Sequence, residues 1–265
     1  MSFLANLLNR KPETLPHIVI LTPVKDAADL AEDYFRRLLE LTFPHRQISI
    51  GLLESDSRDG TYEAFHGPCE RAAMYFRRAR LWKRDFKFHL PKGVPRWGPG
   101  VQTQRRATLA RSRNHLLFLA LDDADWVLWL DVDVIEFPPD IIERLLAVDK
   151  DIAQPHCVKE YGGPSFDLNA WRDRGQKHMH DLRSGNELVE LEAVGGSMLL
   201  VRADLHRDGL IFPPFYYGPH HPFARQDNGQ GTKGEIESEG FGLMAADMNV
   251  KCWGLPRLEV RHRNA

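Results

Sequence analysis

The chain has 265 residues, of which 43% are hydrophobic and 27% charged, and a formal net charge of −2. This is the composition of a globular protein long enough to bury a full core, and the near-neutral charge argues against a dedicated nucleic-acid binder. Its three cysteines are odd in number and widely spaced, so neither a disulfide framework nor a structural zinc site is indicated.

The apolar run within residues 1–16 is too short for a signal peptide or a membrane anchor. We therefore expect an N-terminal extension over residues 1–16, a single domain over residues 17–265, and a cytoplasmic protein.

Two strand-then-helix units open the expected domain. Residues 17–23 (HIVILTP) form a β-branched run that ends at a Thr-Pro breaker, and apolar residues at helical spacing continue to Pro44. A second strand, residues 47–57, ends in a polar cluster and precedes an expected helix over residues 59–82. This order predicts a parallel sheet covered by helices, with polar residues gathered where such sheets bind ligands.

The rest of the chain continues the α/β pattern. We expect helices over residues 103–123, 138–149 and 235–249, and strands over residues 126–135, 151–158, 194–202 and 252–262. Residues 214–234 have little periodic apolar content and many turn formers, which is typical of a mobile loop. We find no internal repeat and no compositional break that marks a second domain.

Basic residues are concentrated between Arg71 and Arg113, where thirteen of them accompany the single acid Asp85. Such a concentration of positive charge can bind phosphates or an anionic membrane surface, so peripheral association with the inner face of a membrane is one interpretation. A solvated helix face is the other.

Three acids follow the most hydrophobic strand, in the stretch WVLWLDVDVIE that ends at Glu136. Along an extended chain Asp131 and Asp133 lie on the same side, where two carboxylates repel each other unless a cation is near. Oxygen ligands of this kind suit Mg²⁺ or Mn²⁺, ions that bind diphosphates. Solvated acids at a strand end are the alternative, and Glu136 can simply face water.

This DxD pattern resembles that of the GT-A nucleotide-sugar glycosyltransferases. Longer stretches narrow the resemblance to glycosyltransferase family 62, the fungal mannan polymerase mannosyltransferases. In chain order they are LARSRN, WVLWLDVDVIEFPPDII, FDLNAW, VGGSMLLVRADLHRDGLIFPPF, ESEGF and GLPRLEVRH. The resemblance covers about residues 17–263 and implies an α/β fold of GT-A type, with a Rossmann-like, mostly parallel sheet flanked by helices.

Two departures from that family stand out. The fungal proteins are type II membrane proteins of the Golgi, and the absence of an anchor here points to a shorter, bacterial-type relative. The 216–234 loop is also longer than in the family pattern, so the acceptor is expected to differ.

The resemblance assigns Asp131 and Asp133 to the metal and diphosphate site, with His262 as a third metal ligand. Asp167 and Glu237, with Glu239, become candidates for contacts to the transferred sugar and the acceptor. Alone, His262 has the features of a surface histidine, and either glutamate those of an acid favoured at a helix N-terminus.

Donor-binding candidates lie at the first two strand ends and on the helix that the resemblance places across the diphosphate. They are Thr22, Pro23, Lys25, Glu54, Asp56, Arg113 and Asn114, joined by Asp131 and by the glycine pair Gly195 and Gly196, which permits close backbone approach. A turn role for Asp56, an Arg113 salt bridge to Asp122 or Asp123, and a β-bulge at the glycines are the structural alternatives.

The expected function is transfer of a hexose to a saccharide or glycolipid hydroxyl with retention, using Mn²⁺ or Mg²⁺ and, by the resemblance, GDP-mannose. Three alternatives stay open: an inverting enzyme with Glu237 or Asp167 as base, a UDP-sugar donor, and a non-catalytic subunit that binds a nucleotide sugar. Oligomer formation is possible under each, and no nucleic-acid partner is expected.

Overall fold

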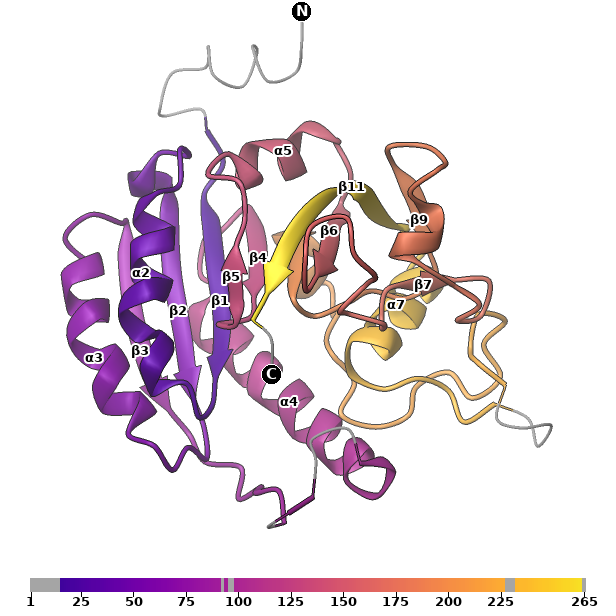
Figure 1. The fold of residues 1–265 in the computed structure, drawn as a ribbon, viewed down its shortest axis with the longest axis horizontal. Coiled ribbons are helices and arrows are strands. Elements are labelled where there is room, and N and C mark those ends of the chain that lie inside the picture. Colours follow the sequence, from indigo (N-terminus) through magenta and orange to yellow (C-terminus); the bar gives the residue numbers. More distant parts are fainter. Residues whose placement is uncertain (1–14, 92, 95–97, 227–231, 264–265) are drawn as a thin grey trace, which may run out of the picture.

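The computed structural model describes residues 15–91, 93–94, 98–226 and 232–263. Most of the expected N-terminal extension therefore lies outside the described residues. A nine-stranded sheet runs through the molecule in the order β3-β2-β1-β4-β10-β6-β11-β5, with β9 paired to β11 (Figure 1). Its strands are β1 (Ile18–Val24), β2 (Ile48–Glu54), β3 (Arg78–Lys83), β4 (Trp126–Leu130), β5 (Val134–Glu136), β6 (Ile152–Val158), β9 (Val189–Leu191), β10 (Met198–Arg202) and β11 (Cys252–His262).

The first four strands are parallel, as expected, and β6 and β11 form another parallel pair. Between these groups β10 runs antiparallel to β4 and to β6, and β5 and β9 run antiparallel to β11. A separate hairpin joins β7 (Trp171–Arg172) to β8 (Lys177–His178).

Helices cover both faces of the sheet. They are α2 (Ala31–Leu39), α3 (Thr61–Ala72), α4 (Pro99–Ala120), α5 (Ile141–Ala147), α6 (Ala203–Arg207) and α7 (Glu237–Asp247), with 3₁₀ turns η2 (Ala28–Leu30), η3 (His45–Gln47) and η4 (Met179–Leu182). None of the helices within the described ranges has the length and apolar character needed to cross a membrane.

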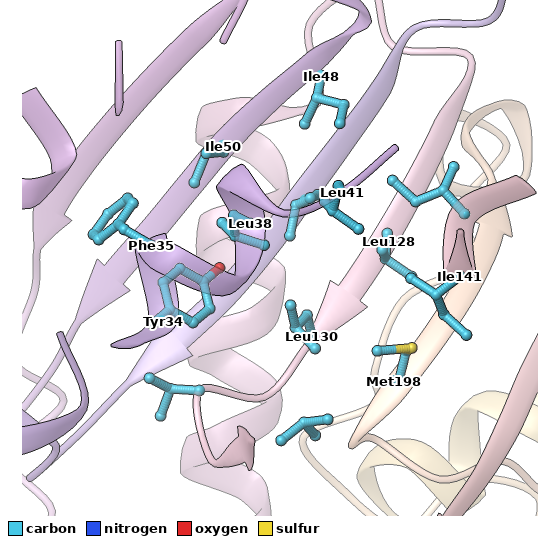
Figure 2. Packing of buried hydrophobic residues seen from close by; sticks show 14 of the residues in the cluster. Tyr34, Phe35, Leu38, Leu41, Ile48, Ile50, Leu128, Leu130, Ile141 and Met198 are labelled. Atoms are coloured by element: carbon cyan, nitrogen blue, oxygen red, sulfur yellow. The ribbon is translucent and has the colours of Figure 1, made fainter. Parts of the chain in front are cut away.

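Strand β1 shows how the sequence forms this layered core. Alternate residues point to opposite faces, so Ile18 and Ile20 join one apolar cluster while Val19 and Leu21 join the other. The first cluster includes side chains of α2, α3 and α5, of which Figure 2 labels those of α2 and α5, and the second includes side chains of α4 and α7. A strand buried on both faces has the continuous apolar sequence seen here.

Two expected elements are wrong in detail. Residues 78–83 form strand β3 instead of continuing the preceding helix. The pattern is that of an edge strand, with Arg78 and Arg80 exposed and Ala79 and Leu81 partly covered. The strand expected over residues 126–135 ends at Leu130. Asp131–Asp133 form a turn, closed by the Val134 amide donating to the Asp131 carbonyl at 3.2 Å, before β5 begins.

The basic stretch does not form a single surface. Across its described residues, Arg71, Arg77 and Arg78 pair with Glu32, Asp123 and Asp122, and Lys83 pairs with Glu54. Arg106 and Arg113 belong to α4 and face the interior. The three cysteines are free and buried.

Candidate functional site

A cavity of about 490 Å³ opens at the carboxyl ends of β1, β2, β4 and β11. Its walls come from the segments that follow these strands, from the 88–90 segment and from one side of α4; they include Pro23–Ala27, Ser55, Asp56, Phe88, Leu90, Arg105, Thr108, Leu109, Ser112, Asp131–Asp133, His262 and Arg263. Polar groups at this edge of the sheet and apolar walls beside them make a space of the size and chemistry of a nucleotide site.

Asp133 and His262 meet at this cavity although 129 positions separate them in the sequence. The Asp133 Oδ1 lies 2.9 Å from the His262 Nε2. The His262 Nδ1 is 2.6 Å from the Arg263 carbonyl, to which it donates, so Nε2 is the nitrogen that faces the carboxylate. Burial lowers the pKa of His262, but the hydrogen bond and charge of Asp133 raise it more, and the net pKa is above its usual value.

Asp131 lies at the centre of a negatively charged group. Burial, reinforced by the carboxylates of Asp133, Asp167 and Glu237, raises the pKa of Asp131 to about 7 against the opposing effect of Arg113. The Arg113 Nη2 donates to the Asp131 Oδ1 at 2.9 Å. A cation at this place would relieve the repulsion among the carboxylates.

The expected metal ligands offer the carboxylate oxygens and the imidazole nitrogen that small divalent cations bind, and Asp133 and His262 are in hydrogen-bond contact with each other. Within the described residues no three His, Cys, Asp or Glu side chains form a ready-made metal cluster. The remaining ligands would then have to come from water and from a bound diphosphate.

At the first two strand ends, Pro23, Lys25 and Asp56 line the cavity, whereas Thr22 and Glu54 do not. The Thr22 hydroxyl is hydrogen-bonded to the Tyr34 hydroxyl inside the core. The Glu54 Oε1 accepts from the Ser57 amide and so supports the turn after β2.

Lys25 and Asp56 hold the wall together. The Lys25 ammonium donates to the Asp56 and Phe88 carbonyls at 2.7 and 3.1 Å. The Asp56 carboxylate accepts from the Phe86 and Lys87 amides at 3.0 and 2.8 Å. The Asp56 carboxylate therefore fixes the 86–88 segment against the cavity, which differs from the local turn role considered for it.

Arg113 and Asn114 lie behind the cavity wall. Arg113 is 1% exposed, donates to the Gly196 carbonyl as well as to Asp131, and has its Nε 3.3 Å from the Glu237 carboxylate. The alternative pairing of Arg113 with Asp122 or Asp123 is wrong. Asn114 exchanges two hydrogen bonds with the Phe212 backbone and so joins α4 to the segment after β10.

The glycine pair does not form a β-bulge. It lets the side chains of Asp167 and Arg113 pack closely against the backbone. A Cβ on Gly195 would lie 2.3 Å from the Asp167 carboxylate, and one on Gly196 would lie 2.5 Å from the Arg113 guanidinium. Asp167 accepts from the Ser197 amide and hydroxyl and from the Asn169 amide.

A buried ionic network extends from Arg113 into α7. Arg113 and Arg106 outweigh the effect of burial and hold the pKa of Glu237 below its usual value. Glu237 itself has φ of +59°, a strained conformation that its surroundings must enforce. Glu239, considered as a helix N-terminal charge, is in the first turn of α7, but its carboxylate is buried and bonded to Arg106, Arg225 and Trp171.

Sequence reasoning missed Ser112, which lines the cavity, and Phe166, which contacts His262. Ser112 is 2% exposed, and its Oγ has no hydrogen-bond partner within the described structure although it lines the cavity. Phe166 stacks on His262 with ring centroids 3.7 Å apart. The position of Ser112 within LARSRN, one residue before Arg113, was the available signal for it.

Comparisons with known proteins bear on the family and the fold. The sequence model of the Anp1 family matches residues 6–184 and 175–216. Mannan polymerase complex subunit mnn9 of Schizosaccharomyces pombe is 30% identical, over 93% of this chain and 80% of that protein. The mannan polymerase II complex ANP1 subunit of Saccharomyces cerevisiae is 27% identical, over 92% of this chain, which spans only 54% of that relative.

Two solved structures share the fold. Mannosyltransferase PcManGT from Pyrobaculum calidifontis, in complex with GDP-Man and Mn²⁺, has a TM-score of 0.56 at 15% identity, covering 98% of this chain and 62% of that chain. S. aureus TarS 1–349 in complex with UDP-GlcNAc has a TM-score of 0.54 at 14% identity, covering 94% of this chain and 59% of that chain.

The fold is that of the GT-A glycosyltransferases, with helices on both faces of a large, mostly parallel sheet. Within this class the chain belongs to the Anp1 family. The expected fold and family are both confirmed.

Proposed function

We propose that this protein is a metal-dependent glycosyltransferase that moves mannose from GDP-mannose to a hydroxyl of a saccharide or glycolipid with retention of anomeric configuration. The observation that carries the proposal is the contact of Asp133 with His262 at the mouth of a nucleotide-sized cavity, with Asp131 beside it. Its family relatives are named as mannan polymerase subunits, and one protein of the same fold was solved with GDP-Man and Mn²⁺.

Asp131, Asp133 and His262 would hold Mn²⁺ or Mg²⁺. When bound, the ion supplies Lewis-acid stabilisation of the diphosphate leaving group. Pro23, Phe88 and Leu90 offer apolar surface to a base, while Arg105 and the unpartnered Ser112 hydroxyl face the same space. Arg113 keeps Asp131 in place from behind.

Retention is supported by the state of the nearby carboxylates. Glu237 is held ionised by two arginines, and Asp167 is occupied by the Ser197 and Asn169 donors, so neither is arranged as a strong base. The acceptor oxygen then forms its bond to the sugar C1 on the face from which the diphosphate oxygen departs. The acceptor proton passes to that departing oxygen.

Calorimetric titration of GDP, UDP and GDP-mannose, with and without Mn²⁺, tests the donor and the metal together. We expect guanine-selective binding that strengthens at least tenfold with Mn²⁺. Asp133→Asn should abolish the metal effect, while Asp204→Asn, an exposed aspartate paired with Arg207 on α6, should leave it intact.

Each other result contradicts a particular part of the proposal. Preference for UDP contradicts the donor, and an inverted product by NMR revives Glu237 or Asp167 as a base. Donor binding without hydrolysis or transfer favours the non-catalytic subunit. Equal metal dependence in Asp133→Asn removes the proposed site.

A further inference from the structure

A hairpin-like segment beside α7 carries two exposed aromatic rings. The Glu237 amide donates to the Pro213 carbonyl at 2.9 Å, and the backbones of Tyr217 and Glu235 exchange hydrogen bonds at 2.8 and 2.9 Å. Phe215 and Tyr216 lie between these contacts and are 58% and 42% exposed. Because Pro213 and Pro214 fix their own φ angles, the rings sit on a restricted backbone.

The aromatic pair is tied to α4, the helix whose Arg113 contacts Asp131, one of the proposed metal ligands. The Tyr216 hydroxyl is 2.9 Å from the Thr103 hydroxyl of α4, and the segment passes the N-terminal part of this helix (Figure 1). Arg106, one turn further, donates to the Ile236 carbonyl, and Arg113 donates to Asp131. The ten residues from Thr103 to Arg113 correspond to about 15 Å along the helix, a length that about three sugar rings span.

The charges around the pair do not favour an anionic partner. Among the described residues nearby, the guanidinium groups of Arg106 and Arg225 are bound by the carboxylates of Glu235, Glu237 and Glu239. The positive charge of these two arginines is therefore compensated within the protein and is not offered to a phosphate or an acidic lipid.

The surface area of two partly exposed rings is also far smaller than that of a protein interface, which buries roughly 800 Å² on each partner. A neutral sugar fits both observations. The C–H face of a sugar packs on an aromatic ring, while its hydroxyls hydrogen-bond to the ring's polar surroundings.

We propose that Phe215 and Tyr216 form an aromatic shelf that binds the acceptor glycan about two or three sugar residues from the reacting hydroxyl. This inference rests on the proposed function, since it takes the acceptor to be a saccharide. It adds that the length of the acceptor controls its affinity.

The test compares methyl α-mannoside with a linear α-linked mannotriose as acceptors, using the full chain with GDP-mannose and Mn²⁺. For wild type we expect a mannotriose KM at least tenfold below that of the monosaccharide. In Phe215→Ala and Tyr216→Ala we expect the mannotriose KM to rise about tenfold, with kcat and the Kd for GDP within twofold of wild type. Tyr216→Phe, which keeps the ring, should change the KM less than threefold.

The matched control is Phe118→Ala, because Phe118 is 77% exposed and lies near the other end of α4. Its mannotriose KM should equal that of wild type. Equal KM values for the two acceptors, or shelf variants with unchanged mannotriose KM, would overturn the shelf while leaving the proposed function standing. If wild type binds GDP-mannose but glycosylates neither acceptor, saturation-transfer NMR still decides, since loss of the mannotriose signal in Phe215→Ala supports the shelf and an equal signal overturns it.

Discussion

Arg113 joins the two halves of the site because it contacts groups from three separate segments. Its guanidinium lies between Asp131, the Gly196 carbonyl and Glu237, and it packs 5.0 Å from the centre of the Phe212 ring. A buried arginine is tolerated where carboxylates and carbonyls surround it in this way. In the structure it donates to Asp131, and the diphosphate contact that sequence reasoning assigned to it stays a prediction.

Gly196→Ala tests this packing. The added Cβ would lie 2.5 Å from the Arg113 Nη2, so the guanidinium must move away from Asp131. We expect transfer to fall at least 100-fold, Mn²⁺ affinity to weaken, and stability to drop by about 2–4 kcal/mol in urea unfolding. Gly100→Ala, in the first turn of α4, meets nothing within 4 Å and should change stability by no more than about 1 kcal/mol. Full activity in Gly196→Ala would contradict the role of Arg113.

Phe166 is expected to orient His262. The two rings stack at 3.7 Å with an interplanar angle of 21°, which together with the Nδ1 bond to Arg263 leaves Nε2 directed at Asp133. Phe166→Ala should weaken Mn²⁺ binding about tenfold, the usual size of such supporting effects. Titration followed by the electron paramagnetic resonance of free Mn²⁺ measures this without turnover, and Phe166→Tyr, which keeps a ring, should bind nearly as well as wild type.

At the scale of elements, the segment after β3 is held by the Asp56 carboxylate together with the Lys25 ammonium. Asp56, at φ +56°, accepts from two backbone amides and thereby holds the 86–88 segment that contributes Phe88 to the cavity. The segment that follows the edge strand therefore forms part of the cavity wall, although β3 itself contributes no lining residue.

Asp56→Asn should weaken GDP binding about tenfold and lower stability by about 1–3 kcal/mol, because an amide can accept only one of the two hydrogen bonds. Mn²⁺ binding by the protein alone should stay the same. Asp149→Asn is the control, since Asp149 occupies an exposed turn at a similar φ of +51°. Calorimetry gives both affinities, and a wild-type GDP Kd in Asp56→Asn would show that the segment does not depend on this carboxylate.

The alternation of strands and helices was predictable because each element has its own periodicity. β3 was not, because its alternate arginines continue a basic run that begins in α3, and the period of two is visible only over six residues. The turn at Asp131–Asp133 was hidden for a related reason, since Val132 and Val134 extend the apolar run past the last paired residue of β4.

Residues that sequence reasoning singled out do meet at one cavity, but the contacts of individual residues could not be predicted. Asp131 and Asp133 were marked as acids after a buried strand and by the family pattern, and His262 by the family pattern alone; all three line the cavity. The hydrogen bonds of Thr22 to Tyr34 and of Asn114 to the Phe212 backbone are made to partners that no local pattern indicates. A polar residue beside a site can hydrogen-bond to partners inside the fold as well as to a ligand.

At the scale of the whole molecule, two buried histidines couple folding to pH. Both His156 and His206 are neutral in the fold, since burial lowers the pKa of each to about 4. The tautomer of His206 is fixed. The Trp129 indole donates to its Nε2 at 3.2 Å, and its Nδ1 donates to the Leu210 carbonyl at 2.6 Å. A second proton on His206 would sit on Nε2, where its N–H would point at the N–H of the Trp129 indole.

The direction in which stability changes with pH follows from comparing the pKa of His206 in the fold, about 4, with its unfolded value near 6.5. Below pH 6.5 the unfolded chain takes up protons that the folded chain does not, so stability falls as the pH drops from about 6.5 to 4. Each histidine contributes about 2 kcal/mol of this loss by pH 5.

His206→Gln can keep both hydrogen bonds without titrating, so its unfolding free energy should fall about 2 kcal/mol less than that of wild type between pH 7 and pH 5. Urea unfolding at the two pH values measures the difference, and His66→Gln, at an exposed histidine of α3, should keep the wild-type slope. An unchanged slope in His206→Gln would mean that His206 is protonated in the fold, against the hydrogen bonds that it makes.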